Sequence, residues 1–268
     1  MKCDYHMHSY YSHDSNTPMT RQAERAVKLG LDEICFTDHV DFYGVDLFGG
    51  DAPDKDYSGY FSEIEQLREK FRGKLTVRAG HEFGLQSHTT AHYEALYAKY
   101  LDKYDFILLS VHEINDLDLW GHDYQHGKTQ AEYTRGYYEE ILRIMQSYHD
   151  YSVLAHLDLI TRYERKNPYP FEGVRDLVRE ILTRAIDEGK GIELNTSSWR
   201  YGLRDTTPCR EILELYHELG GEVLTLGSDA HNPEHLADRM DTARNILKGI
   251  GFTKFCTFEK MRPIFHTL

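Results

Sequence analysis

Seven short apolar runs alternate with segments of helical periodicity, and this alternation limits the fold more than any other feature of the sequence. The runs span residues 2–8, 33–37, 75–80, 106–111, 152–155, 192–194 and 223–227. Strands that are separated by helices join through right-handed crossovers and form a parallel sheet. The sequence therefore predicts an α/β fold, either a closed (β/α) barrel or an open doubly wound sheet.

Helices are expected between these runs because apolar residues recur there every three or four positions. Several of the segments end at a glycine, such as Gly30, Gly73 or Gly189, which is typical of helix C-termini. The expected helices begin at Thr20 and end before Gly30, and span 57–71, 90–101, 129–148, 174–188, 207–219 and 236–247. A short strand is expected over 252–258, and the terminal tail beyond it has no assignment.

Almost every apolar run leads into a side chain that can bind a metal ion or transfer a proton. In a (β/α) barrel the C-terminal ends of all strands meet at one rim, which carries the reactive groups. A barrel explains this pattern better than an open sheet does, and no glycine-rich dinucleotide fingerprint follows the first run. We therefore expect one barrel domain over residues 1–268, because no linker or change in composition divides the chain.

The first run contains His6 and His8, whose side chains would point to the same side of a strand. A metal site needs three or four ligands, so other strands must supply the rest. Nine nitrogen and oxygen donors gather at or near the predicted strand ends: His6, His8, Asp14, His39, Glu82, His112, His156, Asp229 and His231. Nine donors fit two or three ions, and we favour three. The imidazole-rich set without thiolates suits zinc, iron(II) or manganese.

The chain has 16 histidines, and an isolated histidine is more simply explained as a buried or surface polar residue than as a ligand. Six of them lie away from the strand ends and are expected to be structural: His88, His92, His149, His217, His235 and His266.

Composition narrows the classes of partner. A net charge of −13 disfavours nucleic acid, since binding to phosphate backbones requires clustered Lys and Arg. No apolar run is long enough for a membrane span, and the N-terminus lacks an export signal. The four cysteines form no CxxC pair, as expected of reduced thiols in a cytoplasmic protein. We expect a small-molecule substrate; the sequence does not indicate an oligomeric state.

The strand-end motifs resemble those of the polymerase-and-histidinol-phosphatase (PHP) family over almost the whole chain. They are His6-x-His8, Thr37-Asp38-His39, Gly80-His81-Glu82, Ser110-Val111-His112, Ala155-His156 and Ser228-Asp229-Ala230-His231. The resemblance implies a distorted seven-stranded TIM-like barrel with three divalent metal ions. It also implies a phosphomonoesterase that hydrolyses L-histidinol phosphate in histidine biosynthesis. Some members have histidine six residues after the HxH pair; this chain has Asp14 there, with His13 beside it, so either could be the loop ligand.

Phosphate-ester hydrolysis is slow enough that enzymes lower its barrier by up to about 28 kcal/mol, which general acid-base catalysis alone cannot supply. We expect a hydroxide that bridges two ions to attack phosphorus. Arg162 and Arg200, just after strand ends, are expected to bind the phosphate, with Arg165 and Arg204 as weaker candidates. His39, Asp229 or a metal-bound water would protonate the leaving oxygen. One of three acidic residues would face the substrate ammonium group: Asp41, Glu113 or Asp158.

Two alternatives remain open from sequence. The protein could hydrolyse another small phosphate ester or a nucleotide, or it could be a catalytically inactive metal-binding regulatory barrel. A polymerase-associated exonuclease is disfavoured by the acidic charge. An amidohydrolase with a carbamylated lysine is disfavoured because no lysine stands at a strand end.

Overall fold

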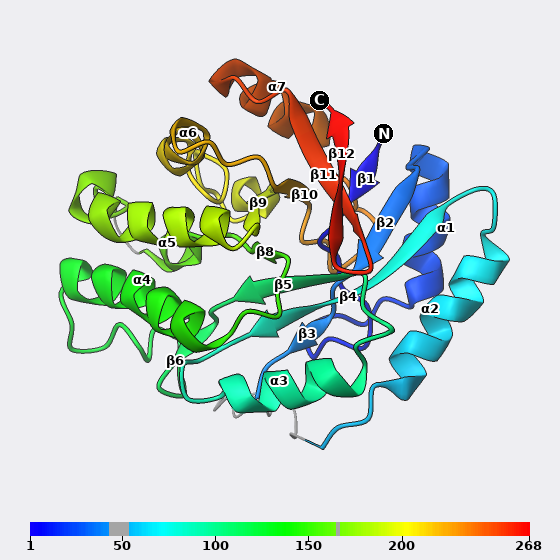
Figure 1. The fold of residues 1–268 in the computed structure, drawn as a ribbon, viewed down its shortest axis with the longest axis horizontal. Coiled ribbons are helices and arrows are strands. Elements are labelled where there is room, and N and C mark those ends of the chain that lie inside the picture. Colours follow the sequence, from blue (N-terminus) through cyan, green and yellow to red (C-terminus); the bar gives the residue numbers. More distant parts are fainter. Residues whose placement is uncertain (43–53, 165–166) are drawn as a thin grey trace.

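The computed structural model describes residues 1–42, 54–164 and 167–268. Residues 43–53 lie outside these ranges, and so does Arg165, one of the weaker phosphate-binding candidates. In the described part of the chain, a mostly parallel sheet curves around the core, and helices surround it (Figure 1).

The strands of the sheet follow the chain in sequence order. They are β1 (Cys3–Asp4), β2 (Glu33–Phe36), β4 (Thr76–Gly84), β5 (Phe106–Ser110), β8 (Val153–Leu154), β9 (Gly191–Asn195) and β10 (Leu224–Gly227), and β3 (His39–Val40) pairs with β4. All of these pairings are parallel. Between the first and last strands, Tyr5 N donates to Leu226 O at 2.9 Å, and Met7 forms a parallel bridge with Ala230. The predicted barrel, rather than an open sheet, is therefore confirmed.

Within the described ranges, seven α-helices connect the strands and cover the outside of the sheet (Figure 1). They are α1 (Met19–Leu29), α2 (Ser58–Lys70), α3 (Thr90–Lys99), α4 (Gln130–Ser147), α5 (Arg175–Asp187), α6 (Arg210–Glu218) and α7 (Met240–Ile250). Short 3₁₀ helices η1 (Leu159–Tyr163), η2 (Phe171–Gly173) and η3 (Ser197–Trp199) lie in the loops. No helix in the described ranges combines the length and the hydropathy that a membrane span requires.

Two helices begin three or four residues later than the sequence predicts, and local backbone geometry explains both differences. Before α6, Thr207 forms an antiparallel bridge with Asn195, so the chain is still extended there. Before α7, Ala237 and Arg239 have φ angles of 56° and 55°. Because a right-handed helix requires negative φ, α7 begins only at Met240.

The first strand is shorter than the predicted run 2–8, because a buried side chain takes over backbone donors at the barrel mouth. The Asp4 carboxylate accepts hydrogen bonds from the main-chain N–H groups of Ser228 at 2.9 Å, Ala237 at 2.8 Å and His6 at 3.3 Å. This carboxylate ties the end of β1 to the segment after β10. The residues after Asp4 therefore pair with the β10 side only through separate contacts, such as the bridge between Met7 and Ala230.

Two antiparallel hairpins extend the fold beyond the barrel. At the mouth, β6 (Glu113–Ile114) pairs with β7 (Leu117–Asp118), a hairpin that the sequence did not predict. The C-terminal tail forms β11 (Lys254–Glu259) and β12 (Arg262–Thr267), of which the sequence predicted only part of the first strand. Figure 1 shows this second hairpin alongside β1 and β10.

The C-terminal hairpin closes the end of the barrel that is opposite the mouth. The Phe258 N–H donates to the Tyr5 hydroxyl at 2.8 Å, and the Phe258 ring lies 5.0 Å from that of Phe106. At the turn, Met261 N donates to the main-chain oxygen of Asp105 at 2.9 Å, just before β5. The tail is therefore part of the hydrophobic core.

We expect Phe258→Ala to lower the free energy of unfolding by about 3–5 kcal/mol, because it leaves a cavity under the barrel. Phe265 on β12 is the matched control: it is 43% exposed, whereas Phe258 is 2% exposed. Phe265→Ala should cost about 1 kcal/mol or less. Urea denaturation of both variants measures the difference, and equal losses would show that the hairpin does not seal the core.

Candidate metal centre

The potential ligands predicted from sequence come together at the C-terminal ends of the strands. They fall into overlapping groups whose donor atoms lie within 4.8 Å of one another. The groups are His8, Asp14, His39 and His231; His6, Glu82 and His156; His6, His8 and Asp229; and His39, Asp41 and His112. All nine predicted donors belong to one of these groups, and Asp41 joins them.

Glu82 on β4 lies at the centre of the cluster and is fully buried. Its Oε1 lies 2.7 Å from His156 Nε2 and 3.1 Å from His112 Nε2. Its Oε2 faces three more imidazoles: His6 Nε2 at 3.0 Å, His39 Nδ1 at 3.2 Å and His8 Nε2 at 3.5 Å. One carboxylate thus joins histidines that follow four different strands of the sheet.

Asp229, just after β10, lies beside the His6 and His8 pair. Its Oδ1 is 3.4 Å from His8 Nε2 and 3.7 Å from His6 Nε2. Its Oδ2 accepts from Arg162 Nη2 at 3.2 Å and from the Ser197 hydroxyl at 3.0 Å. The residue has a φ of 55°, a left-handed conformation that aspartate tolerates better than most residues. This turn directs the carboxylate into the cluster.

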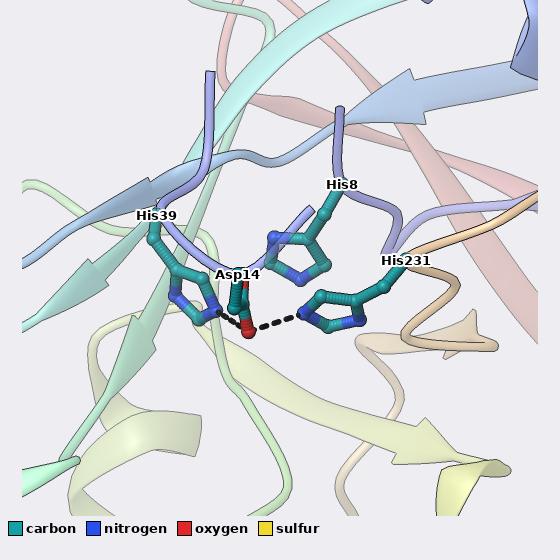
Figure 2. Close-up of side chains that lie close together, drawn as sticks. All are labelled: His8, Asp14, His39 and His231. Atoms are coloured by element: carbon teal, nitrogen blue, oxygen red, sulfur yellow. Dashed lines mark ion pairs between the residues drawn. The ribbon is translucent and has the colours of Figure 1, made fainter. Parts of the chain in front are cut away.

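Figure 2 shows the group that contains the loop residue Asp14. Asp14 Oδ2 lies 2.8 Å from His231 Nε2 and 3.7 Å from His39 Nε2, while the His8 ring stacks on His231 with centroids 4.1 Å apart. His13 is exposed, and its ring stacks against His39 at 5.3 Å. Of the two candidates for the loop ligand, Asp14 belongs to a group of potential ligands and His13 does not.

The spacing of these donors fits divalent cations. Nitrogen–zinc bonds of about 2.0–2.1 Å place two nitrogens on the same ion about 3.0–3.4 Å apart. His6 Nε2 and His8 Nε2 are 3.1 Å apart and face the same carboxylate oxygen. Imidazoles and carboxylates that converge in this way match the donor chemistry of zinc, iron and manganese.

The carboxylates of the cluster and burial shift the pKa values of its imidazoles in opposite directions. Burial lowers the pKa of His6, but Glu193 and Glu82 raise it more, so it lies well above its usual value. For His39, burial is likewise outweighed by Glu82 and Asp14, which raise its pKa to about 9. Burial, with the neighbouring His231 and His39, lowers the pKa of His8 to about 3. Some of these imidazoles therefore carry protons that a metal ion would displace.

The predicted arginines lie at the edge of the cluster. Arg162 in η1 is nearly buried, donates to Asp229 and Ser197, and stacks over the Tyr201 ring with 4.2 Å to the centroid. Arg200 Nη2 donates to the main-chain oxygens of Ser228 at 2.6 Å and Asp229 at 2.8 Å. Both arginines thus hold the segment that carries Asp229. Arg204 is exposed.

Three other buried groups near the cluster have structural partners. His81 packs in the core, where its ring stacks on Tyr60 at 4.4 Å and its Nδ1 lies 2.9 Å from the Tyr104 hydroxyl. Asp158 accepts from Cys209 N at 2.8 Å, and burial raises its pKa to about 7. Glu113 accepts from the Gln86 amide at 3.2 Å.

The six histidines that we expected to be structural belong to none of the potential ligand groups in the described part of the chain: His88, His92, His149, His217, His235 and His266.

Three carboxylates contact the potential ligands, directly or through Ser12, in ways that the sequence did not predict. Asp41 Oδ1 lies 2.8 Å from His112 Nδ1; a Cβ at Gly84 would lie 1.8 Å from that oxygen, so glycine is required there. Asp38 accepts from the Ser12 hydroxyl at 2.8 Å, and Ser12 Oγ lies 3.0 Å from His8 Nδ1. Glu193 contacts His6 from β9. For Glu193, the sequence offered one signal, an acidic residue inside an otherwise apolar strand.

The fold and this cluster define a class of protein. The family model described as PHP domain matches residues 4–197, and the chain belongs to that family. Among curated proteins it is 31% identical to a histidinol-phosphatase of Lactococcus lactis, over 97% of this chain and 96% of that protein. It is 29% identical to a histidinol-phosphatase of Bacillus subtilis, over 86% of this chain and 93% of that protein.

Solved structures agree with this assignment. The structure of the histidinol phosphate phosphatase HisK from Lactococcus lactis, complexed with zinc, L-histidinol and phosphate, matches with a TM-score of 0.87 and 31% identity over 98% of each chain. A putative histidinol phosphatase from Listeria monocytogenes matches with a TM-score of 0.80 at 18% identity, over 90% of this chain and 99% of that one. The latter likeness concerns the fold alone.

We expect zinc binding to the metal-free protein to release protons, because several cluster imidazoles have raised pKa values and must deprotonate to bind. His6, His112 and His231 have pKa values above normal, and that of His39 is about 9. Apparent zinc affinity should therefore rise with pH from near neutral through the pKa of His39. Calorimetry near pH 7 in buffers of different ionisation enthalpy counts the protons; a binding enthalpy independent of buffer would contradict this expectation.

Proposed function

We propose that this protein is a metal-dependent phosphomonoesterase that hydrolyses L-histidinol phosphate to L-histidinol and phosphate. The observation that carries the proposal is the convergence of five histidines on the two oxygens of Glu82 at the barrel mouth. The Lactococcus relative, with zinc, L-histidinol and phosphate in its structure, supports this substrate, because the likeness covers nearly all of both chains.

We propose three divalent ions, of zinc, iron or manganese, with Glu82 shared between two of them. The first would be held by His6, His8, Glu82 and Asp229, the second by Glu82, His112 and His156, and the third by Asp14, His39 and His231. The short distances from Glu82 Oε1 to His156 Nε2 (2.7 Å) and His112 Nε2 (3.1 Å), and from Asp14 Oδ2 to His231 Nε2 (2.8 Å), support these sets. When bound, such ions lower the pKa of water enough to supply a nucleophile near neutral pH and offset charge on the phosphoryl group.

Arg162 and Arg200 would bind the phosphoryl oxygens. Each guanidinium already has one nitrogen fixed by contacts with Asp229 or its main chain. Each also has a buried nitrogen without a hydrogen-bond acceptor in the described part of the chain: Nε of Arg162 and Nη1 of Arg200, the latter 3.9 Å from the Asp238 carboxylate. Buried, unmatched donors at the site edge fit a dianionic ligand, since a charged donor without an acceptor is costly.

Other residues would bind the leaving group. His39 or Asp229 would deliver the proton to the alkoxide of histidinol, since both border the proposed ion sites. An acidic side chain at the mouth would pair with the substrate ammonium, and Asp41, Glu113 or Asp158 could supply it. We further propose that residues 1–268 act as one PHP barrel domain in the cytoplasm, in histidine biosynthesis; the coverage of whole relatives supports the single domain.

A different small phosphate ester is the second candidate, because probable phosphatases of Thermoanaerobacter are also 26% identical over 94% of this chain. A phosphate-release assay on a panel of phosphomonoesters separates the two substrates. We expect histidinol phosphate to exceed the others by more than about tenfold in kcat/KM, or about 1.4 kcal/mol. A smaller preference would remove the specific assignment.

The third candidate, a catalytically inactive metal-binding barrel, is tested on the same purified sample. Protein prepared without chelators should contain at least two ions per chain and should release phosphate. Fewer ions together with no phosphate release would favour the inactive barrel.

We expect Arg162→Ala and Arg200→Ala to keep the metal content and to lower kcat/KM by about 10- to 100-fold, the value of a charge-assisted hydrogen bond of about 1.5–3 kcal/mol. Arg175→Ala is the control, because Arg175 is half-exposed at the start of α5 and pairs with Glu172 of η2. Steady-state kinetics and metal analysis on the same preparations provide the comparison. Wild-type kinetics in both variants would exclude the phosphate role.

A further inference from the structure

Glu193 is a fully buried carboxylate in the middle of β9, where its neighbours Ile192 and Leu194 are core residues. An isolated buried carboxylate is expensive unless hydrogen-bond donors surround it. It belongs to none of the potential ligand groups in the described ranges. The metal centre proposed above gives it no direct role, so its retention in an apolar strand needs another explanation.

The two oxygens of Glu193 contact groups from two different strand ends. Oε1 lies 2.8 Å from His6 Nδ1, and Oε2 accepts from the main-chain N–H of His156 at 3.0 Å and from the Asn195 amide at 3.2 Å. The opposite ring nitrogens of His6 and His156, both Nε2, lie 3.0 Å and 2.7 Å from Glu82. Glu193 therefore contacts the ring of His6 and the backbone of His156, whereas Glu82 contacts the Nε2 atoms of the same two residues.

The two contacts affect the tautomer of the His6 ring and the backbone conformation that orients the His156 ring. A carboxylate at Nδ1 keeps the proton of His6 on that nitrogen and leaves the Nε2 lone pair for an ion. His156 has a φ of 23°, which is unusual for a residue other than glycine and needs external support. The hydrogen bond from its main-chain N–H to Glu193 supplies that support.

The adjacent strand leaves space for this arrangement. A Cβ at Gly227 on β10 would lie 2.0 Å from Glu193 Oε1 and 2.4 Å from His6 Cβ. These distances are too short for any side chain, and Gly227 is not among the glycines with positive φ. Space for the Glu193 and His6 pair, rather than backbone freedom, therefore explains the glycine.

We propose that Glu193 is a positioning residue of the metal centre, which fixes the tautomer of His6 and the backbone of His156 so that both Nε2 atoms face the ions. The inference rests on the proposed metal centre but not on the identity of the substrate. Glutamine cannot replace this function, because its amide has one acceptor oxygen whereas His6 Nδ1–H and the His156 N–H are both donors. In Glu193→Gln, either one of the two contacts is lost or His6 adopts the tautomer in which Nδ1 accepts from the amide and Nε2 carries the proton, and neither arrangement suits metal binding.

The test is zinc affinity of the full chain, measured by competition with a chromophoric chelator, together with the Tm of the metal-free protein. We expect Glu193→Gln to weaken zinc binding by about 10- to 100-fold, as is typical when such supporting groups are removed. The metal-free Tm should change little. Glu140→Gln is the matched control: Glu140 is equally buried on α4 and accepts from Ser87 N at 2.6 Å, away from the cluster. Its zinc affinity should equal that of the wild type.

Wild-type zinc affinity in Glu193→Gln would overturn the inference and leave the proposed function intact. Should that variant not fold, Gly227→Ala replaces it, because the added methyl group displaces the same carboxylate; unchanged affinity there would overturn the inference equally. A wild-type protein that binds no zinc, iron or manganese would instead overturn the proposed metal centre, and this inference with it.

Discussion

The structure of the barrel mouth depends on the contact between one buried carboxylate, Glu82, and five imidazoles. Burial alone would raise the pKa of Glu82, but His6, His39 and the other histidines around it hold the pKa well below its usual value. A charged carboxylate in the core is tolerable only because cationic or donor groups surround it. The histidines around Glu82 are therefore held in place by this carboxylate as well as by the strands that carry them.

The fold explains how residues far apart in sequence reach this carboxylate. Parallel strands all end at the same rim, so each crossover returns the chain to the mouth. Glu82 is contributed by β4, the longest strand of the sheet, and the histidines follow β1, β2, β5 and β8. Asp229 enters through a left-handed turn after β10. Strand order alone thus gathers the cluster, and local turns direct its members.

Much of this arrangement could be predicted from the sequence. Apolar runs ending on His112 or on Asp229 were enough to indicate a barrel and to select donors that the structure brings together, because strand direction determines where such residues lie. The strength of the signal came from repetition, since a single histidine such as His81 proved to be a core residue hydrogen-bonded to Tyr104.

Other features depend on contacts that a one-dimensional pattern cannot express. The support of His6 by Glu193 spans strands that are distant in sequence, and the space for it is a missing side chain at Gly227. The C-terminal hairpin has weak strand signals of its own, and it is fixed by Tyr5 at the other end of the chain. The late start of α7 follows from positive φ angles that helical periodicity does not reveal.

As proposed above, Glu82 would organise the site by sharing its two oxygens between neighbouring ions. Zinc content after reconstitution and gel filtration of the wild type and of Glu82→Gln tests it most directly. A neutral amide keeps the shape of the side chain but removes the charge and one acceptor oxygen. The account predicts three zinc ions per wild-type chain and a loss of the two that share Glu82 in the variant. Equal zinc content in both proteins would contradict it.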